Sequence, residues 1–198
     1  MQSARNVIER VFIFALVCGL WSLAYLGVGH WGGGRAAPTL SWDPVRAVPL
    51  VSVFVVPYLS AFVMPLLLLY TMRDRATYRK YALAVAGTIA VSAAFFIFLP
   101  LTIERPVIEG VSVFDRWLAT LYANDRPTNL FPSLHVSLAF LFAFGVSHDR
   151  PRWKVWMLSW AALIAVSTVF TKQHYVVDAL AGALLAWVAW RAFLKSVK

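Results

Sequence analysis

Long apolar runs constrain the fold of this chain more than any other feature of its sequence. Six of them follow one another, at residues 11–28, 48–72, 81–101, 134–147, 153–170 and 175–194. A helix needs about 20 apolar residues to cross the hydrocarbon core of a bilayer, and within lipid it satisfies its own backbone polar groups. The runs therefore predict an all-α integral membrane protein with six transmembrane helices. The fourth run is the shortest, and Pro57 and Pro65 predict kinks in the second.

The composition agrees with a membrane protein. Apolar residues (Ala, Val, Ile, Leu, Met, Phe, Trp, Tyr and Cys) make up 61% of the 198 residues, and charged residues only 14%. Soluble chains are about 45 to 50% apolar even with glycine counted, so an ordinary soluble domain and a disordered chain are excluded. The net charge of +9 does not indicate binding of nucleic acid, because the apolar runs leave no polar domain that could carry a nucleic-acid-binding surface. We expect one membrane domain over residues 1–198. Its expected partner is the lipid bilayer, and we expect no nucleic-acid partner. The sequence does not indicate the oligomeric state.

Lysine and arginine between the runs predict the orientation of the chain, because cytoplasmic loops carry an excess of these residues. With the N-terminus inside, the inner side has twice as many of them as the outer side. The inner ones are Arg5, Arg10, Arg73, Arg75, Arg79, Lys80, Arg150, Arg152, Lys154, Arg191, Lys195 and Lys198. The outer ones are Arg35, Arg46, Arg105, Arg116, Arg126 and Lys172. We therefore expect both termini in the cytoplasm of a cell-membrane protein.

The connection at residues 102–132 is long for a loop between helices, and loops of this length often carry function. Apolar residues within it recur at helical spacing and share one face of residues 113–122. Two structures fit this pattern equally well. One is an amphipathic helix in the outer membrane interface, and the other is a lid packed on the helix bundle.

His174 and Asp178 are ionisable residues close to membrane depth, where such groups are costly and usually functional. Their i, i+4 spacing places them on one face if the sixth helix has begun. A hydrogen bond from the Nδ1 of His174 to the carboxylate would fix the tautomer of the ring and leave Nε2 unprotonated. The pair suits a nucleophile or base with its orienting partner. The same spacing also fits two residues that only satisfy one another.

A second histidine, His135, stands at the start of the fourth run, in the stretch Phe131-Pro132-Ser133-Leu134-His135. Proline before an apolar run marks a helix start, and Ser133 suits its N-cap or first turn. The amides of that turn would then point outward and form an anion site. Two histidines and a helix N-terminus at one membrane level suit the transfer of a phosphoryl group.

Three basic residues of the outer loops are candidate phosphate ligands. Arg105 and Arg126 each precede a proline in the same loop, and Lys172 lies two residues before His174. A guanidinium group can bind phosphate through two hydrogen bonds. A basic residue in the membrane interface can also contact lipid headgroups without binding the substrate. Both roles stay open for each of the three residues.

Two segments carry a resemblance to a known family. Residues 131–135 and 167–178 resemble the second and third signatures of the type 2 phosphatidic acid phosphatase (PAP2) superfamily in order, separation and position. Arg105-Pro106 resembles the end of the first signature. The match covers residues 99–182, and the first two spans match by topology only.

The resemblance implies a PAP2-type helical bundle and a role for each site residue. His174 would be the nucleophile that forms a phosphohistidine, and Asp178 its orienting partner. His135 would be the acid that protonates the leaving oxygen, and Ser133 and Arg105 would hold the phosphate. The expected substrate is a phosphorylated lipid, hydrolysed at the extracytoplasmic face of the membrane.

Two positions depart from the family pattern. The phosphatases carry a lysine seven residues before the first-signature arginine, where this chain has Phe98, and an arginine after the third-signature serine, where it has Thr168. The form Pro-Ser-Leu-His is instead similar to the branch that contains the inositol phosphorylceramide synthases. Fewer cations suit a phosphodiester donor, so a phospholipid headgroup phosphotransferase is the alternative to a lipid phosphatase. Lys172 or Arg126 could also replace the missing charge and leave phosphatase activity open.

Three further classes are alternatives. A metal site could use His135, His174 and Asp178 as ligands with an open position, but the resemblance is to a metal-free family and we expect no metal or other cofactor. A serine hydrolase could use Ser133, although the chain has no Gly-x-Ser-x-Gly elbow. A non-catalytic membrane bundle or a transporter is the third class.

Overall fold

The structure is a computed structural model that describes residues 2–29, 37–72 and 74–194, without the side chains of residues 2–5 and 194. These residues form helices and loops, with no β-strand among them. The helices are α1 (Gln2–Ser22), α3 (Val55–Ser60), α4 (Met64–Thr71), α5 (Arg75–Phe98), α6 (Val113–Asn124), α7 (Leu134–Asp149), α8 (Lys154–Phe170) and α9 (Val176–Leu194). Short 3-10 turns lie at Pro44–Ala47, Ser52–Phe54, Ala61–Val63 and Pro151–Trp153, and a π-helical turn at Leu23–Gly27 continues α1. The all-α prediction is confirmed.

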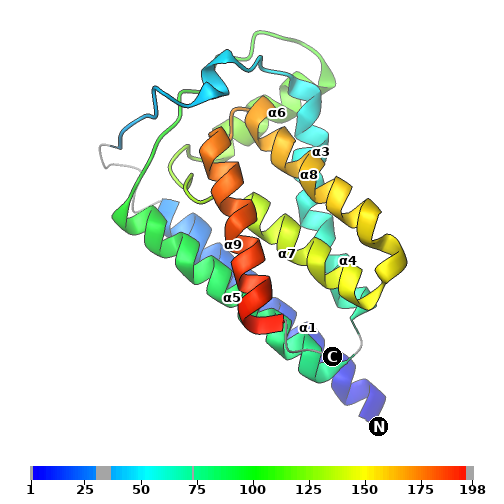
Figure 1. Ribbon diagram of the computed structural model, residues 1–198. Coiled ribbons are helices and arrows are strands. Elements are labelled where there is room, and N and C mark those ends of the chain that lie inside the picture. The colour runs from blue at the N-terminus through cyan, green and yellow to red at the C-terminus, as the bar shows by residue number, and fades with distance from the viewer. Residues whose placement is uncertain (1, 30–36, 73, 195–198) are drawn as a thin grey trace.

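Among the residues that the structure describes, five segments are long and apolar enough to cross a membrane: Asn6–Gly27, Ser52–Thr71, Arg75–Phe98, Pro151–Phe170 and Val176–Phe193. The fourth predicted span corresponds to α7, which is apolar but has only 16 residues. This helix lies at the centre of the bundle against α4, α5, α8 and α9 (Figure 1), and most of its residues are buried. Because protein surrounds α7, it does not need the length of a lipid-exposed helix. A sixth crossing by α7 stays a prediction.

The second predicted span is interrupted before its second proline. α3 ends at Ser60, a 3-10 turn follows, and α4 begins one residue before Pro65. Pro65 has no amide hydrogen to donate to the carbonyl of Ala61, which accepts instead from the Met64 amide in the 3-10 turn, so the helix changes pitch there. Trp160 of α8 stabilises this break, because its Nε1 donates to the Ser60 Oγ over 2.7 Å.

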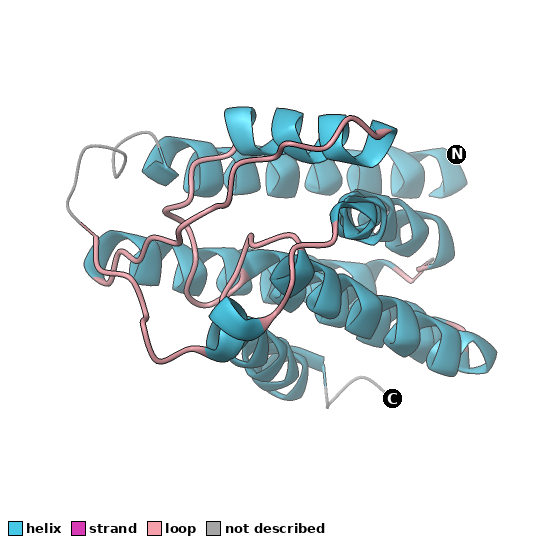
Figure 2. Ribbon diagram, turned by 90° about the horizontal axis from the view of Figure 1, so that it is seen from above, coloured by secondary structure: helices cyan, strands magenta, loops and turns pink. Residues whose placement is uncertain are grey.

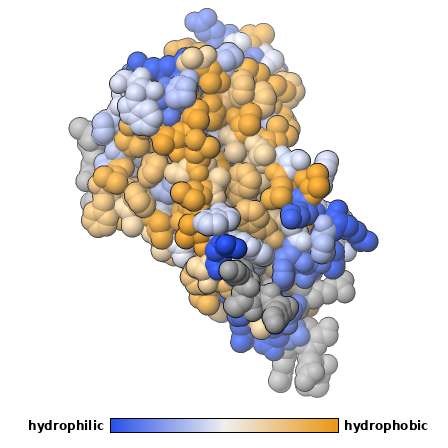
Figure 3. Space-filling view, in the orientation of Figure 1, coloured by the Kyte–Doolittle hydropathy of each residue, from blue (hydrophilic) through white to orange (hydrophobic). Residues whose placement is uncertain are grey.

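The main core lies between α7 and its neighbours, and a close contact with α5 shows how tightly it packs. Tyr81 of α5 is buried against α7 and donates a hydrogen bond to the carbonyl of Leu141. A Cβ at Gly145 would overlap the Tyr81 ring, so only glycine leaves room for the tyrosine. On the outside, large apolar side chains are exposed, and Figure 3 shows apolar surface across the middle of the molecule. Such a surface is typical of helices that face lipid.

The loops with the candidate site residues gather at one end of the bundle. Figure 2 shows them from above, lying over the ends of the helices, whereas the start of α1 and the end of α9 lie together at the opposite end (Figure 1). This arrangement agrees with an even number of crossings. Of the basic residues used to predict orientation, Arg35, Arg73, Lys195 and Lys198 lie outside the described residues, as does the side chain of Arg5. The orientation in the membrane stays a prediction.

The predicted amphipathic segment is the helix α6. Ser112 Oγ accepts from the Asp115 amide over 3.1 Å, and the Asp115 carboxylate accepts from the Ser112 amide over 2.9 Å, which forms a capping box. The helix packs on α3 and on the turn before it, with Leu118 fully buried and Trp117 half exposed. The structure therefore favours the lid packed on the bundle over a helix that lies in the interface alone.

Candidate active site

His135 and His174 lie next to one another at the loop end of the bundle. His135 is in the first turn of α7, and His174 is in the turn that joins α8 to α9, which we call the histidine turn (residues 171–175). The centroids of the two rings are 6.4 Å apart, and their planes are inclined by 53°. Only 9% of His135 and 2% of His174 is exposed. Two buried imidazoles at this distance can act together on one substrate group.

Close packing of α7 on α9 brings the histidines together. The Ser133 amide donates to the carbonyl of Asp178 over 3.1 Å, which ties the start of α7 to the first turn of α9. Gly182, one turn further along α9, lies against the same contact, because a Cβ there would be 2.6 Å from the Ser133 carbonyl oxygen. Tightly packed backbone cannot yield without moving the helices. A side chain at position 182 would therefore separate α7 from α9.

Asp178 lies beside His174 and is fully buried. Its Oδ2 is 3.5 Å from the Nδ1 of His174 and accepts a hydrogen bond from the Tyr175 amide over 2.9 Å. Neither His174 Nδ1 nor Asp178 Oδ1 has a hydrogen-bond partner in the described ranges. The two predicted partners are thus adjacent, at a separation longer than a normal hydrogen bond. Catalytic hydrogen bonds are often long without substrate and shorten when it binds.

Ser133 is the N-cap of α7. Its Oγ accepts from the Val136 amide over 3.3 Å, which satisfies one of the four amides that have no acceptor within a helix. The amides of Leu134 and His135 have no acceptor among the residues that the structure describes. They lie at the positive end of the helix dipole and can donate to an anion.

The guanidinium of Arg105 lies beside the histidine turn and is firmly held. Its Nη2 donates to Gln173 Oε1 over 2.5 Å and to Asp125 Oδ2 over 3.1 Å, and its Nη1 donates to the Asp125 carbonyl over 2.5 Å. The group also lies over the ring of Tyr122, 4.8 Å from its centroid, a favourable cation–π contact. Because Gln173 precedes His174 directly, these contacts fix a positive charge close to His174.

Other parts of the histidine turn hold further loops. The Tyr175 hydroxyl donates to the Thr102 carbonyl over 2.8 Å and accepts from the Leu40 amide over 3.0 Å. The helix α6 contacts the histidine turn through Tyr122, whose hydroxyl donates to the Thr171 carbonyl over 2.7 Å. Burial raises the pKa of Tyr122 to about 12, so this hydroxyl stays a donor at neutral pH. Segments far apart in sequence thus meet at the turn that carries the second histidine.

The structure places the ammonium group of Lys172 on the backbone of another loop. Its Nζ donates to the carbonyl of Val45 over 2.5 Å and to that of Val48. Burial lowers the pKa of this lysine. Its φ of 53° lies in the left-handed region, which residues other than glycine rarely adopt and which is found at functional turns. Lys172 here joins the histidine turn to residues 44–48, so binding of phosphate would require Nζ to leave these carbonyls.

Asp43 caps α9 from a loop 133 residues earlier in the chain. Its Oδ1 accepts from the Val176 amide over 3.1 Å, and its Oδ2 from the Val177 amide over 3.0 Å. The carboxylate is 2% exposed, and a negative charge at this end of a helix is favourable. The N-terminus of α9 is therefore closed by carboxylates, whereas that of α7 keeps two amides without an acceptor in the described part of the chain.

The other predicted cation and the two departures from the family pattern have different surroundings, and of these Thr168 lies directly beside the histidine turn, because its carbonyl accepts from the His174 amide over 3.1 Å. Arg126 is exposed on the surface. Phe98, at the end of α5, is 78% exposed. Thr168 is buried, and its Oγ1 donates to the Ala165 carbonyl over 2.8 Å. The charged group of Arg105 contacts the histidine turn through the side chain of Gln173.

Aromatic rings surround His135. Tyr58 stacks on it at 4.4 Å between centroids, and Phe62 and Tyr25 meet it edge-on at 5.6 and 6.4 Å. The Tyr58 hydroxyl is 3.5 Å from its Nδ1, and its Nε2 has no partner within the described ranges. The rings fix the plane of the imidazole. Nε2 is the nitrogen left to exchange a proton with a substrate.

Sequence reasoning did not find the residues that support the site. Asp125 holds Arg105, and its Oδ1 accepts in turn from the Tyr25 hydroxyl over 2.8 Å. Asp43 caps α9. One signal was present, because acidic residues in a chain with few charges need partners when buried. For Tyr25 and Tyr58 there was none, since aromatic residues occur throughout apolar spans.

Two of the alternative chemistries can be compared with this geometry. Within the described ranges, no group of three or more His, Cys, Asp or Glu side chains lies where it could hold a metal ion. A serine nucleophile would need a histidine in hydrogen-bond reach. The Oγ of Ser133 instead accepts from the Val136 amide.

Comparisons with known proteins show the family to which the chain belongs. The model of the PAP2 superfamily matches residues 35–192, which include both histidines and α3 to α9. An uncharacterized protein of Methanocaldococcus jannaschii is 30% identical over 66 residues, which cover 33% of this chain and 27% of that protein, so the match spans about a quarter of the relative's length. No solved structure matches the chain. The family match extends over most of the sequence and confirms the resemblance seen in the motifs: the chain belongs to the PAP2 superfamily.

Proposed function

We propose that the protein is a membrane lipid phosphatase of the PAP2 type, which hydrolyses a phosphate ester or a diphosphate of a lipid. One observation carries the proposal: His135 and His174 are buried side by side, 6.4 Å between ring centroids, at one end of an apolar helical bundle. Membership of the PAP2 superfamily supports phosphatase-type chemistry. The apolar surface favours a substrate that is itself anchored in lipid.

In the first step His174 is the nucleophile. Its Nε2 forms a bond to phosphorus while the bond from phosphorus to the lipid oxygen breaks, and His135 gives its proton to that oxygen. Asp178, 3.5 Å from Nδ1, stabilises the positive charge that the His174 ring acquires. Arg105 and the amides at the start of α7 bind the phosphate oxygens. The lipid leaves as an alcohol, or as a lipid monophosphate if the substrate is a diphosphate.

In the second step water takes the place of the lipid. Its oxygen bonds to phosphorus, the bond from phosphorus to His174 Nε2 breaks, and His135 accepts a proton from the water. Inorganic phosphate leaves, and both histidines have regained their starting protonation states. The same residue therefore serves as acid and then as base, which requires the fixed ring that the aromatic contacts of His135 favour.

We place the reaction on the extracytoplasmic side of a cell membrane. The site lies at the end of the bundle opposite the start of α1 and the end of α9 (Figure 1). The excess of lysine and arginine in the inner segments supports a cytoplasmic location for those ends.

A phospholipid headgroup phosphotransferase, similar to the inositol phosphorylceramide synthases, is the second candidate. Phe98 and Thr168 replace two cations of the family's phosphatases, and a site with fewer cations suits a phosphodiester, which carries one negative charge. A pocket of about 500 Å³ has Arg105 and Lys172 in its lining and could hold a headgroup or an alcohol acceptor. An alcohol would then take the phosphoryl group from His174 in place of water.

A substrate panel tests the proposal. Purified protein is incubated with phosphatidate, polyprenyl diphosphate, phosphatidylglycerophosphate or phosphatidylinositol, each with and without an added alcohol. Release of inorganic phosphate from a monoester or diphosphate is the expected result. Headgroup exchange with the alcohol and no phosphate release would favour the transferase, and no turnover of any lipid would favour a non-catalytic bundle.

A further inference from the structure

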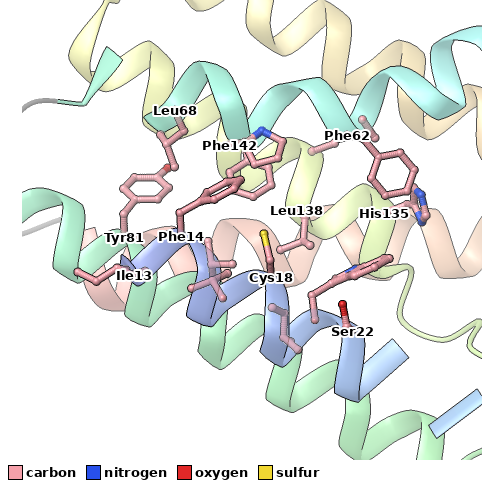
Figure 4. A pocket seen from close by; sticks show the side chains of 18 of the residues that line it. Ile13, Phe14, Cys18, Ser22, Phe62, Leu68, Tyr81, His135, Leu138 and Phe142 are labelled. Atoms are coloured by element: carbon pink, nitrogen blue, oxygen red, sulfur yellow. The ribbon is translucent and has the colours of Figure 1, made fainter. Parts of the chain in front are cut away.

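A groove runs through the apolar part of the bundle and begins at His135, which with His174 forms the proposed catalytic pair. It has a volume of about 300 Å³ and lies between α1, α4, α5 and α7. Figure 4 shows Ser22 and His135 at one end of it and Ile13, Tyr81 and Leu68 at the other. His135 therefore belongs both to the catalytic pair and to the wall of the groove.

The wall of the groove is apolar over most of its length. Between the two ends it is formed by residues such as Phe14, Val17, Leu138 and Phe142. Cavities with such walls stay dry and bind apolar molecules. The polar side chains at the catalytic end are Ser22 and His135, and the Nε2 of His135 has no partner in the part of the chain that the structure describes.

The groove opens sideways, toward the bilayer. Cys18 lines it and is nevertheless exposed, and Phe62 lines it with 49% of its surface exposed. α1 packs mainly on α5 and touches α4 only slightly, so the opening lies between α1 and the interrupted second span. A molecule in the bilayer can therefore enter the groove without passing through water.

We propose that this groove binds one hydrocarbon chain of the phosphorylated lipid, while the phosphate lies at His135 and His174. The inference rests on the proposed function and extends it to the chain of the substrate. From Ser22 to Ile13 the groove follows α1 for about 14 Å at a rise of about 1.5 Å per residue. An extended chain covers this length with about twelve bonds, at about 1.2 Å per bond. Because His135 lies in both sites, the hydrocarbon must begin within a few bonds of the phosphorus.

Two tryptophan variants of α1 test the inference. Cys18→Trp fills the groove, whereas Leu16→Trp places the same ring at a position that is 57% exposed and not part of the wall. We expect Cys18→Trp to lower kcat/KM for hexadecyl phosphate by at least about tenfold, since that is the effect of losing the burial of about two methylene groups. Leu16→Trp should leave kcat/KM unchanged. An unchanged kcat/KM in Cys18→Trp, or an equal loss in both variants, would overturn the inference.

A binding measurement separates this inference from the proposed function. Dodecyl phosphate with a diazirine near its far end is photolysed with the His174→Ala variant, which keeps the groove but lacks the proposed nucleophile, and the labelled peptides are identified by mass spectrometry. Labels at Ile13, Leu68 or Tyr81 are expected. Labels confined to outward-facing residues such as Leu83 would overturn the groove assignment and leave the catalytic proposal intact. Failure of the wild type to hydrolyse any lipid phosphate would instead overturn the proposed function.

Discussion

The two histidines of the candidate site have different neighbouring side chains. His174 has a carboxylate beside its Nδ1, 3.5 Å away, whereas His135 is enclosed by Tyr58, Phe62 and Tyr25. A ring that bonds to phosphorus becomes positively charged and gains from a nearby negative charge. A ring that gives and accepts a proton gains from a fixed plane and one available nitrogen. The surroundings therefore favour His174 as the nucleophile and His135 as the acid and base.

Asp178→Asn tests the orienting role. The amide oxygen can still accept from the Tyr175 amide, so we expect little change in the thermal midpoint of unfolding. Turnover should fall by about 10⁴-fold, as for the orienting aspartate of the serine proteases, because the amide supports the wrong tautomer and carries no charge. The measurement is turnover of a lipid phosphate, with His174→Ala as the inactive reference. Activity within tenfold of the wild type would contradict the assignment.

Asp125→Asn tests the positioning of Arg105. The carboxylate contacts the guanidinium at 3.1 Å and is partly buried, and hydrogen bonds to charged groups contribute about 1.5 to 3 kcal/mol. We expect KM for a lipid phosphate to rise by about tenfold or more, which corresponds to the lower end of that range, while the thermal midpoint falls little. A purely structural aspartate would change the midpoint and leave KM alone.

The chain offers a matched control for this variant. Glu104 pairs with Arg46 at 3.5 Å in the same outer region, but both side chains are mostly exposed. Exposed ion pairs contribute little, so Glu104→Gln should leave both KM and the thermal midpoint unchanged. An equal rise of KM in both variants would show that loss of a negative charge anywhere in this region raises KM, and would contradict a specific role of Asp125 in positioning Arg105.

Among the elements, the histidine turn depends on contacts that come from other parts of the chain. Asp43 caps the helix that follows it, Lys172 ties it to residues 44–48, and Tyr175 holds residues 40 and 102. These contacts include backbone groups that would otherwise be buried without a partner. The outer loops therefore act as part of the scaffold of the site.

Asp43→Ala tests this dependence. The change leaves the amides of Val176 and Val177 without their acceptor in a partly buried place, where an unsatisfied donor costs up to about 1 to 3 kcal/mol. We expect the thermal midpoint in detergent to fall and turnover at low temperature to fall with it, because the first turn of α9 carries Asp178. An unchanged midpoint would contradict the role of Asp43 as a cap.

Asp74→Ala is the exposed counterpart of this variant. Asp74 caps α5 by accepting from the Thr77 amide over 2.7 Å, and hydrogen bonds from the Thr77 side chain and amide hold the pKa of Asp74 below its ordinary value. A carboxyl with a lowered pKa stabilises the folded state above its ordinary pKa, and this contribution is lost as the pH falls through the lowered value. The midpoint difference between wild type and Asp74→Ala should be small at pH 7 and vanish in acid. A difference that grows in acid would contradict the cap.

Local patterns in the sequence were enough to predict the helices and to choose the two histidines. Apolar runs, the i, i+4 spacing of His174 and Asp178, and Ser133 before an apolar run are all features of neighbouring residues. The supporting contacts were not predictable in this way. Asp43 and Val176 are 133 residues apart, and Arg105 and Gln173 are 68 apart, and no periodic pattern marks such pairs. The length of α7 shows a second limit, because hydrophobicity alone does not distinguish a helix covered by protein from one covered by lipid.

The molecule as a whole has an apolar middle, a loop end with the site, and an opposite end where α1 starts and α9 stops (Figures 1 and 3). At that opposite end Arg75 and Arg79 pair with Glu9. Basic residues near the ends of spans favour the cytoplasmic side. The orientation of the bundle therefore decides on which side of the membrane the candidate site lies.

Cysteine labelling tests this orientation. In a Cys18→Ala background, Val111→Cys adds a thiol at a position that is 87% exposed in the outer loop, and Ala76→Cys adds one at an exposed position near the start of α5. An impermeant thiol reagent should label the first in intact cells and the second only after permeabilisation. The reverse pattern would overturn the proposed topology and the side of catalysis with it.

The proposed mechanism passes the phosphoryl group through a covalent bond to His174, and this phosphohistidine can be trapped. Purified protein is mixed with a lipid substrate that carries radioactive phosphate, stopped in alkaline denaturant after a few milliseconds, and digested for mass spectrometry. We predict a phosphoprotein that is stable in base and labile in acid, with the label on His174 and none in the His174→Ala variant. Label on another residue such as Ser133, or turnover that persists in His174→Ala, would show that His174 is not the nucleophile.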